Sequence, residues 1–124
     1  MTVAKHRLPR KAVAALPTGS APPLTEAQFQ RQITEYAELC GWEWMHPRAG
    51  RTVDSWRTPM SGTMAKGWPD LVLIRDRRLI FMEVKRAGAM ATADQLRVLD
   101  VLAGAAETYT VRPKDWDFIE AALA

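Results

Sequence analysis

The chain has 124 residues, of which 48% are hydrophobic and 25% are charged, and it contains one cysteine. These values are typical of a single globular domain, and they exclude a disulfide-stapled framework or a low-complexity chain. No apolar run is long enough to cross a bilayer. Prolines and basic residues interrupt residues 1–23, so we expect no secretory signal and a cytoplasmic protein.

The net charge of +3 is unevenly distributed along the chain. Residues 1–23 contain no acidic residue and four basic ones, namely Lys5, Arg7, Arg10 and Lys11. A basic tail on a nearly neutral body predicts a polyanionic partner such as nucleic acid, although a disordered solubilising leader has the same composition. We therefore expect a basic disordered tail over 1–23 and one folded domain over 24–124.

The first predicted helix begins after Thr25, because Thr25 and Gln28 have the spacing of a capping box. Apolar residues then recur at helical spacing, and Gly41 ends the helix. These residues are Phe29, Ile33, Tyr36, Ala37 and Cys40. We expect a short strand over 42–46 and then a long irregular stretch over 47–69.

Two strand-like segments follow, over 70–74 and 79–85, joined by a polar turn at residues 75–78. A second helix is predicted from Thr92, with Gln95 completing its capping box and Gly104 ending it. Its inward residues are expected to be Leu96, Leu99, Leu102 and Ala103. A strand over 109–111 and a helix over 113–123 complete the order, which predicts an α/β domain with a mixed sheet.

The most informative pattern is Asp70 followed by Glu83-Val84-Lys85. If the hairpin turn is centred on residues 76 and 77, Asp70 lies opposite Glu83, with Cβ atoms roughly 4.5–5.5 Å apart. Two carboxylates at that separation repel each other unless a cation lies between them, and Mg²⁺ or Mn²⁺ prefers such ligands. Lys85 shares their face because strand side chains alternate. The alternative interpretation is a solvated salt bridge.

Two further residues are candidates for the same site. Glu26 lies close to the apolar stripe of the first helix on a helical wheel, which predicts a carboxylate at the edge of the buried face and a third metal ligand. An acidic residue in the first turn also stabilises a helix through its dipole, so this alternative stays open. His46 can be a ligand too, although a lone histidine at a strand end is more often structural.

The chain resembles the PD-(D/E)XK nuclease superfamily, and more narrowly a stand-alone VRR-Nuc domain. The resemblance is carried by Gly67-Trp68-Pro69-Asp70, Glu83-Val84-Lys85 and Gln95, and it covers about 100 residues from Thr25 onward. It implies a restriction-endonuclease-like core, a mixed β-sheet flanked by helices in the order αβββαβ with a C-terminal helix. It implies the catalytic residues Glu26, Asp70, Glu83, Lys85 and Gln95. It further implies Mg²⁺ or Mn²⁺ held by Asp70, Glu83, the Val84 carbonyl and Glu26.

The resemblance also implies a substrate and a setting. Domains of this kind cut branched DNA, such as a Holliday junction or a flap, during repair or replication in bacteria or phage-infected cells. They are often homodimers, and a helicase or replication partner is conceivable. A non-catalytic binder of branched DNA and a small protein-interaction module are the alternative hypotheses.

Basic residues in the long loop and beside the catalytic motif predict where DNA binds. Phosphate contacts are expected from Arg48, Arg51, Arg57, Lys66 and Arg86. Trp56 and Trp68 can stack on unpaired bases, although core packing is the commoner role of a tryptophan.

Overall fold

The computed structural model describes residues 23–47, 50–51, 56–57 and 60–124, so the predicted tail and Arg48 lie outside the described residues apart from Pro23. The helices are α2 (Glu26–Leu39), α3 (Ala93–Ala103) and α4 (Trp116–Leu123), the last preceded by a 3-10 turn (Pro113–Asp115). The strands are β1 (Glu43–Met45), β2 (Gly50–Arg51), β3 (Trp56–Arg57), β4 (Leu71–Arg75), β5 (Arg78–Val84) and β6 (Glu107–Val111). None of the described helices has the length and apolarity needed to span a membrane.

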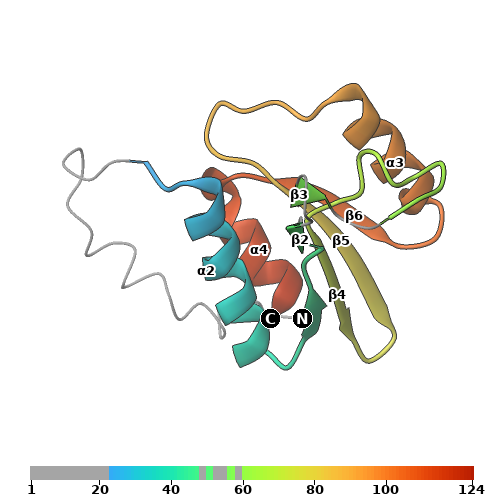
Figure 1. The fold of residues 1–124 in the computed structure, drawn as a ribbon. Coiled ribbons are helices and arrows are strands. Elements are labelled where there is room, and N and C mark those ends of the chain that lie inside the picture. Colours follow the sequence, from blue (N-terminus) through green and yellow to red (C-terminus); the bar gives the residue numbers. More distant parts are fainter. Residues whose placement is uncertain (1–22, 48–49, 52–55, 58–59) are drawn as a thin grey trace.

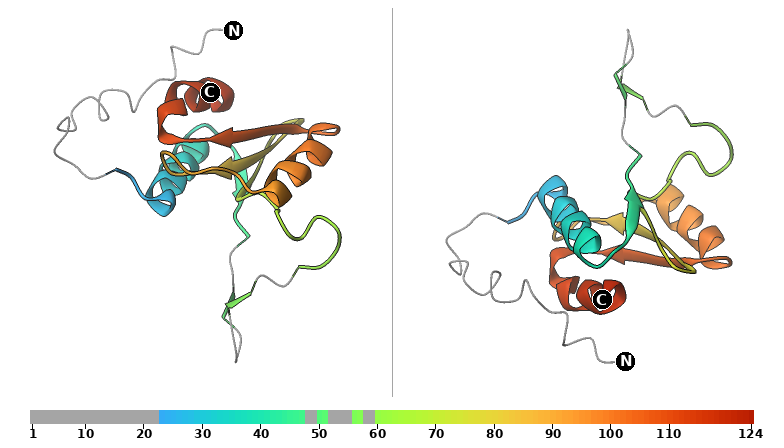
Figure 2. Two further views of the ribbon diagram at one scale, coloured as in Figure 1. Left: turned by 90° about the horizontal axis from the view of Figure 1, so that it is seen from above. Right: turned by 90° about the horizontal axis from the view of Figure 1, so that it is seen from below.

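The main sheet has four strands in the order β1-β4-β5-β6. The β1–β4 and β4–β5 pairs are antiparallel and the β5–β6 pair is parallel. Figures 1 and 2 show α2 and α4 together on one side of this sheet and α3 on the other. The predicted α/β class with a mixed sheet is therefore confirmed.

Strand alternation separates the hydrophobic core from the face that carries the charged motif. On β4 and β5, the core side chains are Leu71, Leu73, Ile80, Met82 and Val84, which cluster with buried residues of α2 and α4. The intervening side chains, including Phe81 and Glu83, point to the opposite face, where α3 lies. The sheet thus presents Glu83 to α3 and away from the main core.

Both helix starts are confirmed. Thr25 and Gln28 form a capping box at α2, and Thr92 and Gln95 form one at α3. The predicted inward face of α3 is partly wrong, because Leu96 is 56% exposed. Gln95 points inward and donates to Glu83, and the next helical residue is turned by about 100°, which carries Leu96 outward. Leu99 is buried as predicted, Val98 is buried in addition, and Ala103 is exposed, contrary to the prediction.

The prediction that the stretch 47–69 is irregular is partly wrong. The stretch contains the antiparallel pair β2–β3, in which Gly50 pairs with Arg57 and Arg51 with Trp56. This pair forms a separate two-stranded sheet, and in Figure 2 it stands away from the four-stranded sheet. Strands of two residues carry no period that could be recognised in a sequence.

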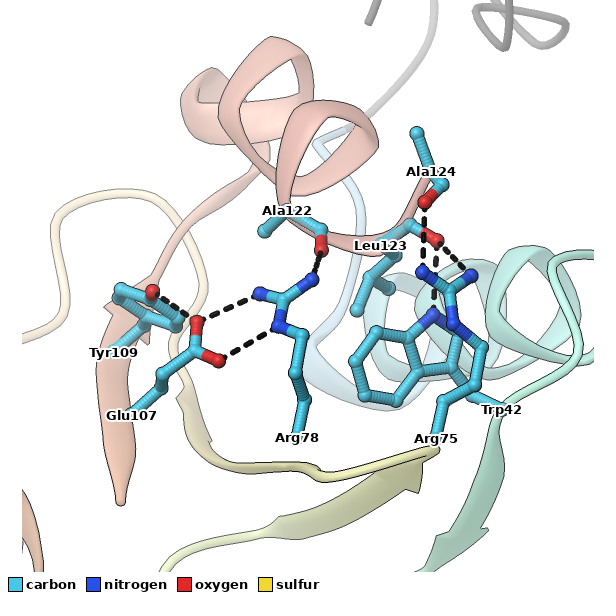
Figure 3. Close-up of polar contacts among 8 residues, drawn as sticks. All are labelled: Trp42, Arg75, Arg78, Glu107, Tyr109, Ala122, Leu123 and Ala124. Atoms are coloured by element: carbon cyan, nitrogen blue, oxygen red, sulfur yellow. Dashed lines mark hydrogen bonds and ion pairs between the residues drawn. The ribbon is translucent and has the colours of Figure 1, made fainter. Parts of the chain in front are cut away.

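Two arginines at the ends of the β4–β5 turn fasten α4 to the hairpin (Figure 3). Arg75 donates to the main-chain carbonyls of Cys40, Leu123 and Ala124 at 2.8, 3.2 and 2.9 Å. Arg78 donates to the Ala122 carbonyl and forms a two-bond pair with Glu107. Both guanidinium groups lie over the ring of Trp42, at 4.6 and 5.2 Å from its centroid. Cations at the C-terminal end of a helix also interact favourably with its dipole.

Replacing Arg75 by alanine should lower the free energy of unfolding by about 2–3 kcal/mol, because several charge-assisted hydrogen bonds to main-chain carbonyls are lost together. Arg77→Ala is the matched control, since Arg77 is an exposed residue of the same turn and should change stability by less than about 0.5 kcal/mol. Urea unfolding followed by tryptophan fluorescence measures both. Equal effects of the two substitutions would show that the contacts of Arg75 do not fasten α4.

Candidate functional site

The β4–β5 hairpin has the register that the sequence predicts. Leu71 pairs with Met82 and Arg75 with Arg78, which leaves residues 76 and 77 as a two-residue turn. Asp76 occupies the left-handed region with φ 55°, as such a turn requires at its first position. One step before Leu71 in the same register, Asp70 lies opposite Glu83. The side-chain Oδ2 of Asp70 accepts a hydrogen bond from the Val84 amide at 2.8 Å, which holds its carboxylate against β5.

Glu83 is one of two buried carboxylates among the described residues, with 1% of the residue exposed; the other is Glu120 on α4, which is 0% exposed. The Oε2 of Glu83 accepts a hydrogen bond from Gln95 Nε2 at 2.7 Å and lies 3.3 Å from Lys85 Nζ. Its Oε1 has no hydrogen-bond partner among the described residues. A buried carboxylate oxygen that lacks a partner is costly in a folded protein.

Burial and the neighbouring charge of Asp70 raise the pKa of Glu83 from 4.5 to about 7, and the Lys85 ammonium opposes this rise. The closeness of the Asp70 carboxyl group thus favours the protonated form of Glu83. The two carboxyl groups therefore interact directly across the hairpin. When Glu83 is ionised, the group carries one net negative charge, because one lysine faces two carboxylates.

His46 follows β1 and fixes the main chain of Asp70. Its Nδ1 lies 2.7 Å from the Asp70 carbonyl oxygen, and because a carbonyl only accepts, Nδ1 carries the proton. This contact favours the structural interpretation of the histidine. The sequence could not reveal it, because the long connection between β1 and β4 leaves their register undetermined.

A cavity of about 460 Å³ opens beside Asp70. Its lining includes Pro47, Lys66, Gly67, Pro69, Asp70 and Gln95. Lys66 is highly exposed, and its Nζ lies 3.4 Å from a carboxylate oxygen of Asp94. A ligand in this cavity would contact Asp70 directly, whereas Glu83 lies beneath Gln95.

The first residue of the Gly-Trp-Pro-Asp motif must be glycine for a steric reason. Gly67 has φ +100°, and a Cβ atom there would lie 2.5 Å from the Asp94 carbonyl oxygen. Only glycine lets the loop approach the first turn of α3 so closely. The motif thus docks the loop that leads into Asp70 against the helix that carries Gln95.

Gly67→Ala should therefore be more damaging than Gly62→Ala. Gly62 also has positive φ, +110°, but a Cβ atom there would meet nothing within 4 Å. We expect backbone strain of about 1–2 kcal/mol at both positions and a further loss of about 2 kcal/mol at Gly67, where the loop must move away from α3. Thermal unfolding of both variants checks this. Equal losses would mean that the close approach is unimportant.

Other predicted site residues lie elsewhere. Glu26 is exposed, so its expected position at the edge of the buried face is wrong: the whole first turn of α2, residues 26–28, is exposed. In the described part of the chain, no group of three His, Cys, Asp or Glu side chains is placed to hold a metal ion, so Glu26 does not join Asp70 and Glu83. Arg86 is exposed beyond β5, and β2 and β3 contain Arg51 and Arg57.

Gln95 performs two tasks at once, because its Oε1 accepts the Thr92 amide while its Nε2 donates to Glu83. Gln28 has the same capping role in α2 and provides a matched control. Gln28→Ala should cost about 1 kcal/mol of stability or less, whereas Gln95→Ala should cost about 1–3 kcal/mol more, because the buried Glu83 loses one of its hydrogen-bond donors. Urea unfolding of both variants measures the difference. Equal losses would show that the bond to Glu83 contributes nothing.

Comparisons with family models, with curated proteins and with solved structures found no match to this chain. The described residues form a mixed α/β fold in which three α-helices flank a four-stranded sheet. What the site does must be inferred from its own residues.

Proposed function

We propose that this chain is a metal-dependent deoxyribonuclease with a restriction-endonuclease-like core of the VRR-Nuc type, which hydrolyses phosphodiester bonds in branched DNA. The observation that carries the proposal is the opposition of Asp70 and Glu83 across the hairpin, with Lys85 on the same face. A surface salt bridge needs no buried carboxyl group whose pKa is raised to about 7. Strongly perturbed pKa values that arise from burial and a specific charged neighbour are typical of functional sites.

The residues fit a hard divalent cation. Glu83 has a buried Oε1 with no partner among the described residues, and Asp70 faces it with a second carboxylate. Mg²⁺ commonly binds one or two carboxylates while retaining water and substrate phosphate as its other ligands, so a third acidic side chain is not required. The proposed ligands are Asp70, Glu83 and the Val84 carbonyl; Glu26 is not among them, because it does not join this group. When bound, Mg²⁺ or Mn²⁺ would supply Lewis-acid activation of water and neutralise phosphate charge.

The protein's own groups have distinct proposed tasks. Lys85 places a positive charge 3.3 Å from Glu83 and can stabilise negative charge that develops on the phosphate. Gln95 orients Glu83 through its 2.7 Å hydrogen bond. Exposed Lys66 lies beside the cavity at Asp70 and can contact a neighbouring phosphate.

We propose further phosphate contacts from Arg48, Arg51, Arg57 and Arg86, so DNA affinity should fall steeply with salt. A homodimer would bring two sites to two strands of a junction or flap. We propose a cytoplasmic role in bacterial or phage DNA repair or replication, with a helicase or replication protein as a conceivable partner.

Incubation of the chain with labelled junction, flap, nicked, single-stranded and duplex DNA tests the proposal. Each substrate is tested with Mg²⁺, with Mn²⁺ and with EDTA, and Asp70→Asn is the control protein. We expect cleavage of at least one branched substrate that requires the metal and Asp70. Binding of branched DNA without cleavage in Mn²⁺ would contradict the proposal and favour the non-catalytic binder.

A further inference from the structure

A second cavity, of about 450 Å³, adjoins the one at Asp70. It is lined by residues 60–65 and 68, and its apolar lining consists mainly of Met60, Met64, Ala65 and Trp68. Met60, Ala65 and Trp68 line both cavities, so the two spaces are neighbours that share a wall. The indole nitrogen of Trp68 is buried, and the ring therefore offers its carbon surface.

The loop that forms this second cavity is held in place by α3 and β5. Arg97 donates to the Thr63 carbonyl, and Lys66 pairs with Asp94. The Trp68 ring packs edge-to-face on Phe81 of β5, with centroids 5.3 Å apart. The cavity is therefore formed by a docked loop, whose approach to α3 depends on Gly67 as described above.

We propose that this second cavity binds the base of an unpaired nucleotide next to the phosphate that is cut. The inference rests on the proposed nuclease function, because it places that phosphate in the adjoining cavity beside Asp70. The chemistry of the two spaces matches the two ends of a nucleotide. The second, apolar cavity suits the planar base, and the cavity beside Asp70 is where the anionic phosphate would lie. Trp68 lies only two residues before Asp70 in the chain, so a single nucleotide can contact both.

This arrangement explains a preference for branched DNA. A paired base is stacked within its duplex and cannot enter a side cavity without first being extruded, whereas a base at a flap or junction is already free to do so. Aromatic and methionine surfaces bind any base through its flat face. We therefore expect a preference for an unpaired nucleotide at the cut, with little preference for which base it carries.

An abasic nucleotide placed at the mapped cleavage position of a flap substrate tests the inference without altering the protein. The control substrate carries the abasic nucleotide several positions away. We expect KM to rise at least about fivefold for the first substrate and to stay unchanged for the control, since stacking contributes measurably to affinity for each base. Equal KM values for the abasic and intact substrates would overturn the inference, while metal-dependent cleavage would leave the nuclease function standing.

Met64→Gln provides a second measurement, because it makes the cavity polar with little change in side-chain length. Met90→Gln is its control, since Met90 is 80% exposed in another loop. We expect Met64→Gln to raise KM for the intact flap and to shrink the penalty for the abasic one, with Met90→Gln unchanged. An undiminished abasic penalty in Met64→Gln would place the base elsewhere. Absence of any Asp70-dependent cleavage would overturn both this inference and the proposed function.

Discussion

Asp70→Asn should lower cleavage of branched DNA by at least about 1,000-fold, or about 4 kcal/mol in activation free energy. Asparagine retains a carbonyl oxygen that can accept the Val84 amide, so the loop and hairpin should keep their geometry. What is lost is the negative charge that, with Glu83, would attract the cation. Cleavage is measured by gel with an excess of enzyme, and DNA affinity is measured in parallel with Ca²⁺ in place of Mg²⁺.

Lys85→Met extends this test to the positively charged lysine side chain of the site. It removes the charge 3.3 Å from Glu83 while keeping an unbranched apolar side chain in a buried position. Cleavage should again be lost, with DNA binding retained, since most phosphate contacts are proposed to come from exposed Lys66 and the arginines. Lys114→Met is a suitable control because Lys114 is exposed. Cleavage that survives both Asp70→Asn and Lys85→Met would refute the proposed mechanism.

Without divalent cation, stability should fall as pH rises from about 5 to about 8, and Glu83 should be the cause. Its pKa is about 7 in the folded protein and near its ordinary value of 4.5 in the unfolded chain. Between these values the folded state binds more protons, so the free energy of unfolding decreases with pH. The total loss should reach about 3 kcal/mol, at about 1.4 kcal/mol per pKa unit.

Urea unfolding at closely spaced pH values in EDTA measures this dependence. Glu83→Gln is the comparison, because a neutral amide at this position cannot titrate and its curve should be flatter by the amount assigned to Glu83. Mg²⁺ should restore stability above pH 7, where it competes with the proton for the carboxylate. Parallel curves for the two proteins would show that Glu83 titrates near its ordinary pKa.

The parts of the fold that the sequence predicted are those encoded by local rules. Both capping boxes depend on residues three positions apart, at Thr25 and Thr92. The hairpin register follows from strand alternation and a two-residue turn, so the opposition of Asp70 and Glu83 was predictable. In each case the determining residues are close in the chain, and no tertiary information is needed.

The parts that the sequence did not predict depend on contacts between distant segments. The arginines at 75 and 78 were interpreted only as a polar turn, because their carbonyl partners at residues 122–124 are brought close by folding. Leu96 was expected inside, and the rotation of α3 that exposes it is set by the bond of Gln95 to Glu83. A helical wheel shows that Glu26 lies near the apolar stripe of α2. It does not show whether the sheet extends as far as the first turn of that helix.

The central claim is that Asp70 and Glu83 together bind one divalent cation. Calorimetric titration of the EDTA-treated, dialysed protein with Mn²⁺ near pH 7 tests it most directly, with Glu35→Gln as a control for an exposed carboxylate on α2. One saturable site is expected, with proton release as Glu83 ionises, and with affinity reduced at least about tenfold in Asp70→Asn and in Glu83→Gln but not in Glu35→Gln. Mn²⁺ affinity that is the same in all four proteins would contradict the claim.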